Sequence, residues 1–304
     1  MAITKVRVQI NGVWTNCTKN SSGKWMCNPT APNITSYNQD GKYYPVMVEI
    51  TNDAGTVASY SASSPNIGTS LRLVVKEKVK PIITLISPTD GTRTKNNKQP
   101  VKFQVTDETS GSGINQSTVA LTLDDAVYKH GSAGMTVTPI TNGYEYTYTP
   151  SAALKDGPHT ISIAVSDNDG NAAAAVSASF TVDVTKPVLT VSSPAENLIT
   201  NKASQTISGM TNDATSSPVT ITITLNGTDV GAITVGTDGA FSKAVTLKEG
   251  TNAIIVKATD SAGNETTITR TAKLDTAVPQ LNEVTISPNP ANASASVQIV
   301  LDIT

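Results

Sequence analysis

The stretch Asp167-Asn168-Asp169-Gly170-Asn171, which leads to Thr185-Lys186-Pro187, decides the fold of this chain. It closes one alternating apolar run, turns at Asn and Gly residues, and continues through a second run to a proline. The same order returns twice, at Asp260-Ser261-Ala262-Gly263-Asn264 before Thr276-Ala277-Val278-Pro279 and, less fully, at Asn52-Asp53-Ala54-Gly55 before Val79-Lys80-Pro81. Self-similarity of this kind predicts tandem domains of one architecture.

The spacing of the repeat gives the size of one domain. Pro81 and Pro187 are 106 residues apart, and Pro187 and Pro279 are 92 apart, close to the ~100 residues of a β-sandwich. We therefore predict an all-β fold of three tandem sandwiches, at residues 1–78, 79–185 and 186–277. Residues 278–304 are too few for a fourth sandwich, so we expect a two-strand extension or the start of a truncated domain. These strands either fold back on each other or pair with a partner chain.

Turn signals divide each unit into short strands. Runs such as Ile161-Ser-Ile-Ala-Val165 alternate apolar and polar residues, as half-buried strands do. Six turn pairs stand between such runs: Asp90-Gly91, Asn142-Gly143, Asp156-Gly157, Asn226-Gly227, Asp238-Gly239 and Glu249-Gly250. We expect hairpins at these pairs, because the favoured hairpin turn needs positive φ at both central residues.

The junctions between units are short and contain proline. They run from Glu77 to Pro81, from Asp183 to Pro187 and from Asp275 to Pro279. Because proline fixes its own φ and restricts the residue before it, we expect a semi-rigid rod of domains.

Composition excludes several classes of partner. The formal net charge is −2, so no basic field attracts nucleic acid. The basic stretches Lys76–Lys80 and Arg93–Lys98 lack interleaved aromatic residues and are interpreted as solvated surface. No apolar run reaches the ~18–20 residues of a membrane helix, so no membrane insertion is expected. The first ten residues alternate like a strand and lack the parts of a secretory signal, which favours Met1 as the native start.

Units 79–185 and 186–277 contain motifs of a known family. The matching segments are Val105–Ile114, Asp156–Val165, Asp169-Gly170-Asn171, Leu225-Asn226-Gly227, Asp238–Phe241, Leu247–Ile254 and Ala258–Asn264. They resemble bacterial immunoglobulin-like (Big-type) repeats, which occur in tandem in surface and phage-particle proteins. The resemblance covers about two thirds of the chain. It implies three tandem immunoglobulin-like sandwiches, but no single function, because one such fold has many roles.

Unit 1–78 shares less with these repeats. Only Val48–Gly55 and Leu71–Glu77 follow the pattern. Its opening and residues 35–46 are similar to N-terminal domains of phage or contractile-particle tail proteins. The resemblance implies a non-enzymatic structural or adhesive protein of a phage tail, capsid or contractile phage-like particle, anchored by residues 1–78.

The same resemblance implies a location and partners. The protein would be part of a virion or phage-like particle, assembled in the cytoplasm and exposed after lysis. Its partners would be other particle subunits or further copies of itself, and its projecting domains would contact a host surface or a bacterial surface glycan. Two alternatives stay open, namely a bacterial cell-surface adhesin stalk and the carbohydrate-binding accessory region of a secreted enzyme.

Catalytic signals are missing from the sequence. The two histidines, His130 and His159, lie in predicted loops without a Cys or second His at metal-ligand spacing, and we interpret both as exposed. No Gly-x-Ser-x-Gly elbow is present, and no pattern pairs a nucleophile with a base. We expect no catalytic residue and no enzyme activity.

Cys17 and Cys27 lie in one predicted hairpin of unit 1–78. If its turn centres on Ser22, the two residues face each other and a cross-strand disulfide can form; free thiols are the alternative in a reducing cytosol. Trp14 and Trp25 lie in the same region. We favour core packing for both tryptophans, with an anchoring surface as the alternative, because aromatic residues dominate interface hot spots.

The acidic turns are candidate calcium sites. Asp167 and Asp169 gather carboxylates within a few residues, and Asp260 stands at the same place in the next repeat. Calcium takes six to eight oxygen ligands, and no complete calcium loop is present. The alternative is that the turns serve geometry alone, with Asn and Gly supplying positive φ. We favour that alternative and expect no cofactor.

Overall fold

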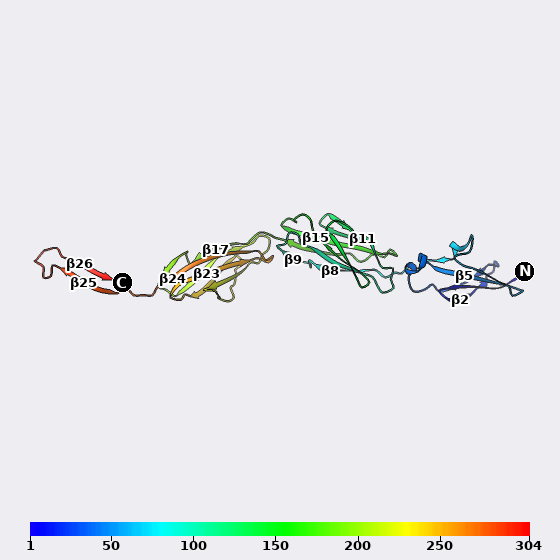
Figure 1. The fold of residues 1–304 in the computed structure, drawn as a ribbon, viewed down its shortest axis with the longest axis horizontal. Coiled ribbons are helices and arrows are strands. Elements are labelled where there is room, and N and C mark those ends of the chain that lie inside the picture. The colour runs from blue at the N-terminus through cyan, green and yellow to red at the C-terminus, as the bar shows by residue number, and fades with distance from the viewer. The chain divides into compact units, whose positions relative to one another are not determined.

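The computed structural model describes residues 1–304 and is all-β, as predicted. Only three short 3₁₀ turns interrupt the strands: η1 Ser36–Asn38, η2 Asp40–Lys42 and η3 Gly68–Leu71. The chain forms two compact units, Met1–Val182 and Asp183–Thr304 (Figure 1). None of its helical segments has the length and apolar character to cross a bilayer.

The N-terminal domain is one small sheet. Its strands are β1 Ile3–Ile10, β2 Val13–Asn16, β5 Tyr44–Asn52, β6 Val57–Tyr60 and β7 Arg72–Leu73, in the order β2-β1-β5-β6 with β7 paired to β5. Asn11 and Gly12, with φ of 47° and 81°, close the β1–β2 hairpin. A separate ribbon pairs β3 Thr18–Lys19 with β4 Trp25–Met26. Few side chains are buried here, among them Val6, Ile10, Cys17 and Tyr44.

Residues 82–182 form a two-sheet sandwich. Its strands are β8 Ile82–Ser87, β9 Thr92–Thr94, β10 Val101–Thr106, β11 Ile114–Leu123, β12 Ala126–Lys129, β13 Met135–Ile140, β14 Gly143–Tyr148, β15 Gly157–Asp167 and β16 Val176–Val182. One sheet has the order β13-β14-β10-β8 and the other β12-β11-β15-β16-β9. Alternate residues of β10 and β15 point inward, and Phe103, Tyr146 and Phe180 fill the core between the sheets.

Residues 188–274 repeat this architecture. The strands are β17 Val188–Ser193, β18 Leu198–Thr200, β19 Ser204–Asn212, β20 Thr220–Leu225, β21 Thr228–Asp229, β22 Ala240–Thr246, β23 Gly250–Thr259 and β24 Glu265–Leu274. The sheets have the orders β17-β19-β22 and β18-β24-β23-β20-β21. β-Branched residues such as Ile207, Ile223 and Ile254 dominate the core, with one phenylalanine, Phe241.

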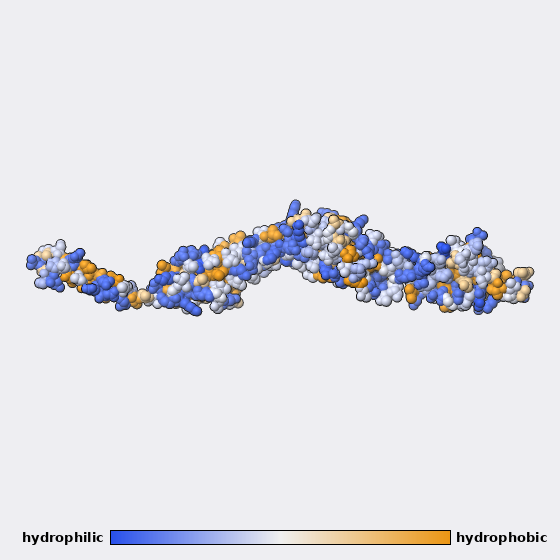
Figure 2. Space-filling model, in the orientation of Figure 1, coloured by the Kyte–Doolittle hydropathy of each residue, from blue (hydrophilic) through white to orange (hydrophobic).

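The last two strands form a hairpin of their own. β25 Leu281–Ser287 pairs antiparallel with β26 Gln298–Ile303. The first strand of each sandwich pairs in the same way, β8 with β10 and β17 with β19. Every residue of the hairpin is exposed, and its apolar side chains show as orange atoms near the C-terminal end (Figure 2).

Three of the six predicted turn pairs do not close hairpins. Asn142-Gly143 and Asn226-Gly227 do, between β13 and β14 and between β20 and β21, and Asp238-Gly239 closes a short turn before β22. Asp90-Gly91, Asp156-Gly157 and Glu249-Gly250 instead lie where the chain crosses from one sheet to the other. At the three crossovers only Gly91, Gly157 and Gly250 have positive φ, whereas Asn226 and Gly227 both do, as the favoured hairpin turn requires.

We expect Tyr146 to make the 82–182 sandwich less stable at alkaline pH. The ring is fully buried against Phe103, and burial, with Tyr144 nearby, raises the pKa of Tyr146 to about 12. Its protonated form is therefore favoured on folding, so the stabilisation is complete below pH ~10 and is lost as pH rises from there towards the folded pKa. We expect the free energy of unfolding to fall by about 2 kcal/mol over that range. Tyr146→Phe should lose less over the same range; urea unfolding followed by circular dichroism measures both, and equal losses would contradict this assignment.

Candidate metal centres

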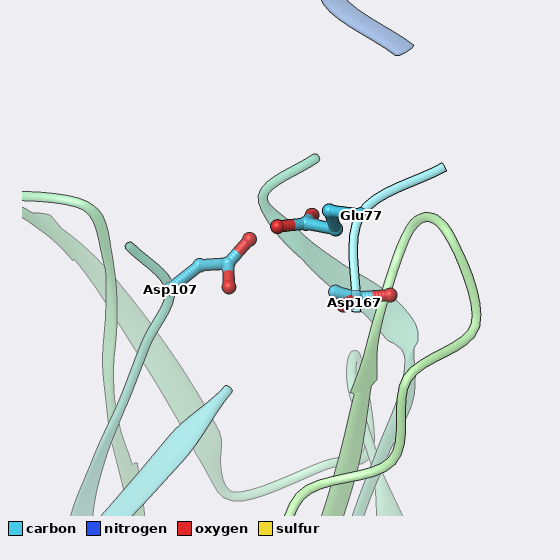
Figure 3. Close-up of side chains that lie close together, drawn as sticks. All are labelled: Glu77, Asp107 and Asp167. Atoms are coloured by element: carbon cyan, nitrogen blue, oxygen red, sulfur yellow. The ribbon is translucent and has the colours of Figure 1, made fainter. Parts of the chain in front are cut away.

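Three carboxylates from distant parts of the chain meet at one end of the 82–182 sandwich. Glu77 precedes β8, Asp107 follows β10 and Asp167 ends β15. One oxygen from each lies within 4.8 Å of the other two. Figure 3 shows the carboxyl groups of Glu77 and Asp107 pointing toward each other, with Asp167 beside them. We call this group the first acidic centre.

Backbone donors fix the first acidic centre. Asp107 Oδ2 accepts a hydrogen bond from the Gly113 N–H at 2.7 Å, and Glu77 Oε1 accepts one from the Ser112 N–H. The carboxylate of Asp167 accepts from Asn171 twice, from its backbone N–H at 2.8 Å and from its side-chain Nδ2 at 2.7 Å. The loop after β10 and the turn after β15 thus hold the three acids together.

Several oxygens of this centre have no donor. Asp107 Oδ1, Glu77 Oε2 and the nearby Glu108 Oε2 are buried without a hydrogen-bond partner. None of the three acids forms an ion pair, because the six ion pairs of the chain involve other carboxylates. Burial raises the pKa of Asp107 above its ordinary value; the charges of Glu77, Asp167 and Asp169 add to the rise, against the Gly113 hydrogen bond.

The second sandwich has the same arrangement. Asp183, Asp213 and Asp260 form the second acidic centre, with one oxygen of each within 4.8 Å of the others, and all three are buried. Asp183 is fully buried and its Oδ2 has no partner. Asp213 Oδ1 accepts from the Ser216 N–H at 2.6 Å, and the buried hydroxyl of Ser216 also has no partner.

An asparagine bridges the same two positions in both centres. Asn171 Nδ2 donates to Asp167 Oδ2 and to the backbone carbonyl of Glu77, at 2.7 and 3.3 Å. Asn264 Nδ2 donates to Asp260 Oδ2 and to the carbonyl of Asp183, each at 2.8 Å. The N-terminal domain has Asn52 where the sandwiches have these aspartates. The side-chain oxygen Oδ1 of Asn52 accepts hydrogen bonds from the N–H groups of Ala54 and Thr56 in its own turn.

Two of the three predicted calcium candidates lie in these centres. Asp167 and Asp260 do; Asp169 does not, because its carboxylate accepts hydrogen bonds from the Thr35 hydroxyl and the Glu77 N–H. Sequence reasoning missed Glu77, Asp107, Asp183 and Asp213. One signal was present: an acid stands four residues before the proline that opens each sandwich, Glu77 before Pro81 and Asp183 before Pro187.

The prediction of two exposed histidines was wrong for His159. This residue lies in β15 and is 7% exposed. Its Nδ1 pairs with Asp124 Oδ2 at 2.8 Å and its Nε2 with the Lys155 carbonyl at 2.8 Å, so both ring nitrogens are occupied. His130 is exposed, as predicted, and its Nδ1 lies 3.3 Å from the Tyr146 hydroxyl.

The structure joins Cys17 and Cys27 in a disulfide. The β3–β4 register pairs Thr18 with Met26, so the turn does centre on Ser22 and the cysteines face each other. The favoured core packing of Trp14 and Trp25 was wrong, since both are only half-buried. Trp14 stacks under the Arg7 guanidinium at 4.1 Å, and the Lys19 ammonium lies 5.8 Å from the ring of Trp25.

Both sandwiches match known domain families. Residues 80–184 match the family described as "Bacterial Ig-like domain". Residues 187–276 match the family described as "Glucodextranase, domain B". These are tandem immunoglobulin-like domains. The predicted resemblance to bacterial immunoglobulin-like repeats is thereby confirmed, with the direct family match at residues 80–184.

Individual relatives are more distant. A segment of 121 residues is 31% identical to Bacillopeptidase F of Bacillus subtilis (strain 168), covering 40% of this chain and 8% of that protein. Among solved structures, the fibronectin(III)-like modules of Clostridium thermocellum CbhA align with 64% of this chain and 94% of theirs, at 17% identity and a TM-score of 0.41. Sidekick-1 immunoglobulin domains 1–4 align with 90% of this chain and 68% of theirs, at 10% identity and a TM-score of 0.36.

Proposed function

We propose that this chain is a non-enzymatic adhesive component of a phage tail, capsid or phage-like contractile particle. Its N-terminal domain docks onto other particle subunits, and its Ig-like domains project toward a host surface or a bacterial surface glycan. The particle is assembled in the cytoplasm and exposed after lysis. Ig-like domains fit a non-enzymatic adhesive or accessory role, and both nitrogens of the buried His159 are used structurally.

The surface chemistry of the N-terminal domain supports a docking role. All four cation–aromatic stacks of the chain lie between residues 7 and 72: Arg7 with Trp14, Lys19 with Trp25, Lys42 with Tyr37 and Arg72 with Tyr43. Val13 and Met26, the neighbours of the two tryptophans, are 68% and 51% exposed. A groove of about 430 Å³ runs beside the β1–β2 hairpin, lined by Ile10, Val13, Thr15 and residues 28–33. Half-exposed aromatic and arginine side chains are typical of interface hot spots.

A second candidate function comes from the comparisons. One Ig-like domain matches a family named after an enzyme's domain, and the relative in Bacillus subtilis is a peptidase. In this alternative the chain is the accessory region of a secreted enzyme, and its surface binds carbohydrate. The Cys17–Cys27 disulfide is compatible with it, because disulfides persist outside the reducing cytosol. A bacterial cell-surface stalk is a third location for the same architecture.

Replacing the tryptophans tests the docking role. We expect Trp14→Ala and Trp25→Ala each to weaken retention of the full chain on purified particles by about tenfold or more, because hot-spot truncations cost at least ~2 kcal/mol. Co-sedimentation of tagged chain with particles from lysed cells measures the bound fraction. Tyr60→Ala is the matched control, since Tyr60 is an exposed aromatic residue of the same domain outside the four stacks.

The outcomes separate the candidates. Equal retention of the tryptophan variants and the control would contradict docking through this surface. Absence of the wild-type chain from purified particles, together with binding on an array of bacterial wall and capsule sugars, would favour the accessory function.

A further inference from the structure

We propose that each acidic centre binds one calcium ion, held by Glu77, Asp107 and Asp167 in the first Ig-like domain and by Asp183, Asp213 and Asp260 in the second. Such ions would fix the segment through which the chain enters each Ig-like domain, wherever the chain is anchored.

Charge is the first argument. Each centre places three carboxyl groups with oxygens within 4.8 Å of one another, and no lysine, arginine or histidine pairs with any of them. Like charges at such a distance repel strongly when they are shielded from water. Asp183, Asp213 and Asp260 are 0%, 7% and 5% exposed. A divalent cation between them supplies the missing countercharge.

Unsatisfied oxygens are the second and independent argument. The side chain of Asp183 is fully buried and that of Asp107 is 7% exposed, yet Asp183 Oδ2 and Asp107 Oδ1 accept no hydrogen bond. The buried Ser216 hydroxyl beside Asp213 has no partner either. Buried polar atoms are nearly always satisfied, so each exception needs a partner such as an ion. The other oxygens of these carboxylates are held by backbone donors, which leaves the unpartnered ones to coordinate a cation.

The repetition of the arrangement is the third argument. In both Ig-like domains three acids converge: one before the first strand, one directly after the strand that pairs with it (β10 or β19), and one at the end of β15 or directly after β23. Asn171 or Asn264 bridges two of the three positions. Most surrounding residues differ between the two domains. In the N-terminal domain the equivalent turn has Asn52 and only its own backbone donors, so we expect no third site there.

The donor set selects the ion. Each centre offers carboxylates, with a hydroxyl in the second, and no histidine or cysteine. Oxygen-only sites favour hard cations over zinc or copper. Calcium accepts six to eight oxygens in irregular geometry, including both oxygens of one carboxylate, whereas magnesium needs a near-ideal octahedron. Three carboxylates from three separate segments suit calcium better.

Thermal unfolding of the full chain tests the proposal. The probe is calcium at about 1 mM, within the range in which extracellular calcium modules are half-saturated, with EGTA and with magnesium at the same concentration as comparisons. We expect both Ig-like domains to melt about 5 °C or more higher in calcium than in EGTA, with a smaller rise in magnesium.

Variants with a neutral side chain distinguish calcium binding from a merely structural role, because their melting temperatures should be lower than that of the wild type in calcium but not in EGTA. Asp107→Asn and Asp213→Asn should lose the calcium shift, each in its own domain only. In EGTA each variant should melt at the same temperature as the wild type or higher, because one of three repelling charges is gone. Asp125→Asn and Asp238→Asn are the matched controls, since both are exposed acids of the same domains, and they should keep the full shift.

Two results would overturn the proposal. One is a wild-type chain whose melting is the same in calcium and in EGTA. The other is a calcium shift that persists in Asp107→Asn and Asp213→Asn, which would place the ion on surface carboxylates.

Discussion

Phe103→Ala will remove about 3 to 5 kcal/mol from the free energy of unfolding of the first Ig-like domain, and will leave the second unaffected. Phe103 has no exposed surface, lies in the middle of β10, and stacks on Tyr146 with ring centroids 5.2 Å apart. Truncation leaves a cavity that the two sheets cannot close, because their backbones are held by hydrogen-bonded ladders on both sides of β10. Domains of this size have a total stability of only ~5–15 kcal/mol, so the loss is large.

Differential scanning calorimetry of the full chain measures this effect. The cores of the two Ig-like domains share no residue, so we expect one transition to move to lower temperature and one to stay. Phe103→Leu is the control: it keeps an apolar side chain at the site and should cost less. A single transition that moves as a whole would show that the domains do not unfold separately.

Gly209→Val will destabilise the second Ig-like domain by about 3 kcal/mol or more, at the upper end of the cost of overpacking. Gly209 lies in β19, and a Cβ there would be 2.0 Å from the Thr190 carbonyl oxygen in the neighbouring β17 and 2.8 Å from Phe241 Cζ. The first of these atoms belongs to the backbone, so the side chain cannot be accommodated by a rotamer change. Strand β17 would have to separate from β19.

Differential scanning calorimetry of the full chain measures this effect through the transition of the second Ig-like domain. Thr206→Val is the control; it places the same valine in the same strand at an exposed position and should change stability by less than ~0.5 kcal/mol. If Gly209→Val melted like this control, the close packing of β17 on β19 would be wrong.

Local patterns predicted the fold class well. Alternation in runs such as Val101–Thr106 and Gly157–Asp167 places every second residue in the core, which the structure confirms. The same alternation predicts that His159 is buried, since His159 stands in phase with Ile161, Ile163 and Val165. Because Asp156-Gly157 was interpreted as a hairpin turn, His159 was expected in a loop and its burial was not predicted.

The acidic centres could be predicted only in part. Asp167 and Asp260 stand in turns whose composition is visible locally, but their partners come from far along the chain. Asp107 is 60 residues before Asp167 in sequence, and only the closing of two sheets over one core brings them together. Repeat alignment is the signal that finds them, because Glu77 and Asp183 stand at equal distances before Pro81 and Pro187.

Calcium binding by the two acidic centres is tested most directly by a crystal structure of the chain grown with calcium, or with terbium in its place, in which anomalous scattering locates the ions. We expect one strong peak among Glu77, Asp107 and Asp167 and another among Asp183, Asp213 and Asp260. Peaks at exposed carboxylates such as Asp125 and Asp238, with none at either acidic centre, would contradict it.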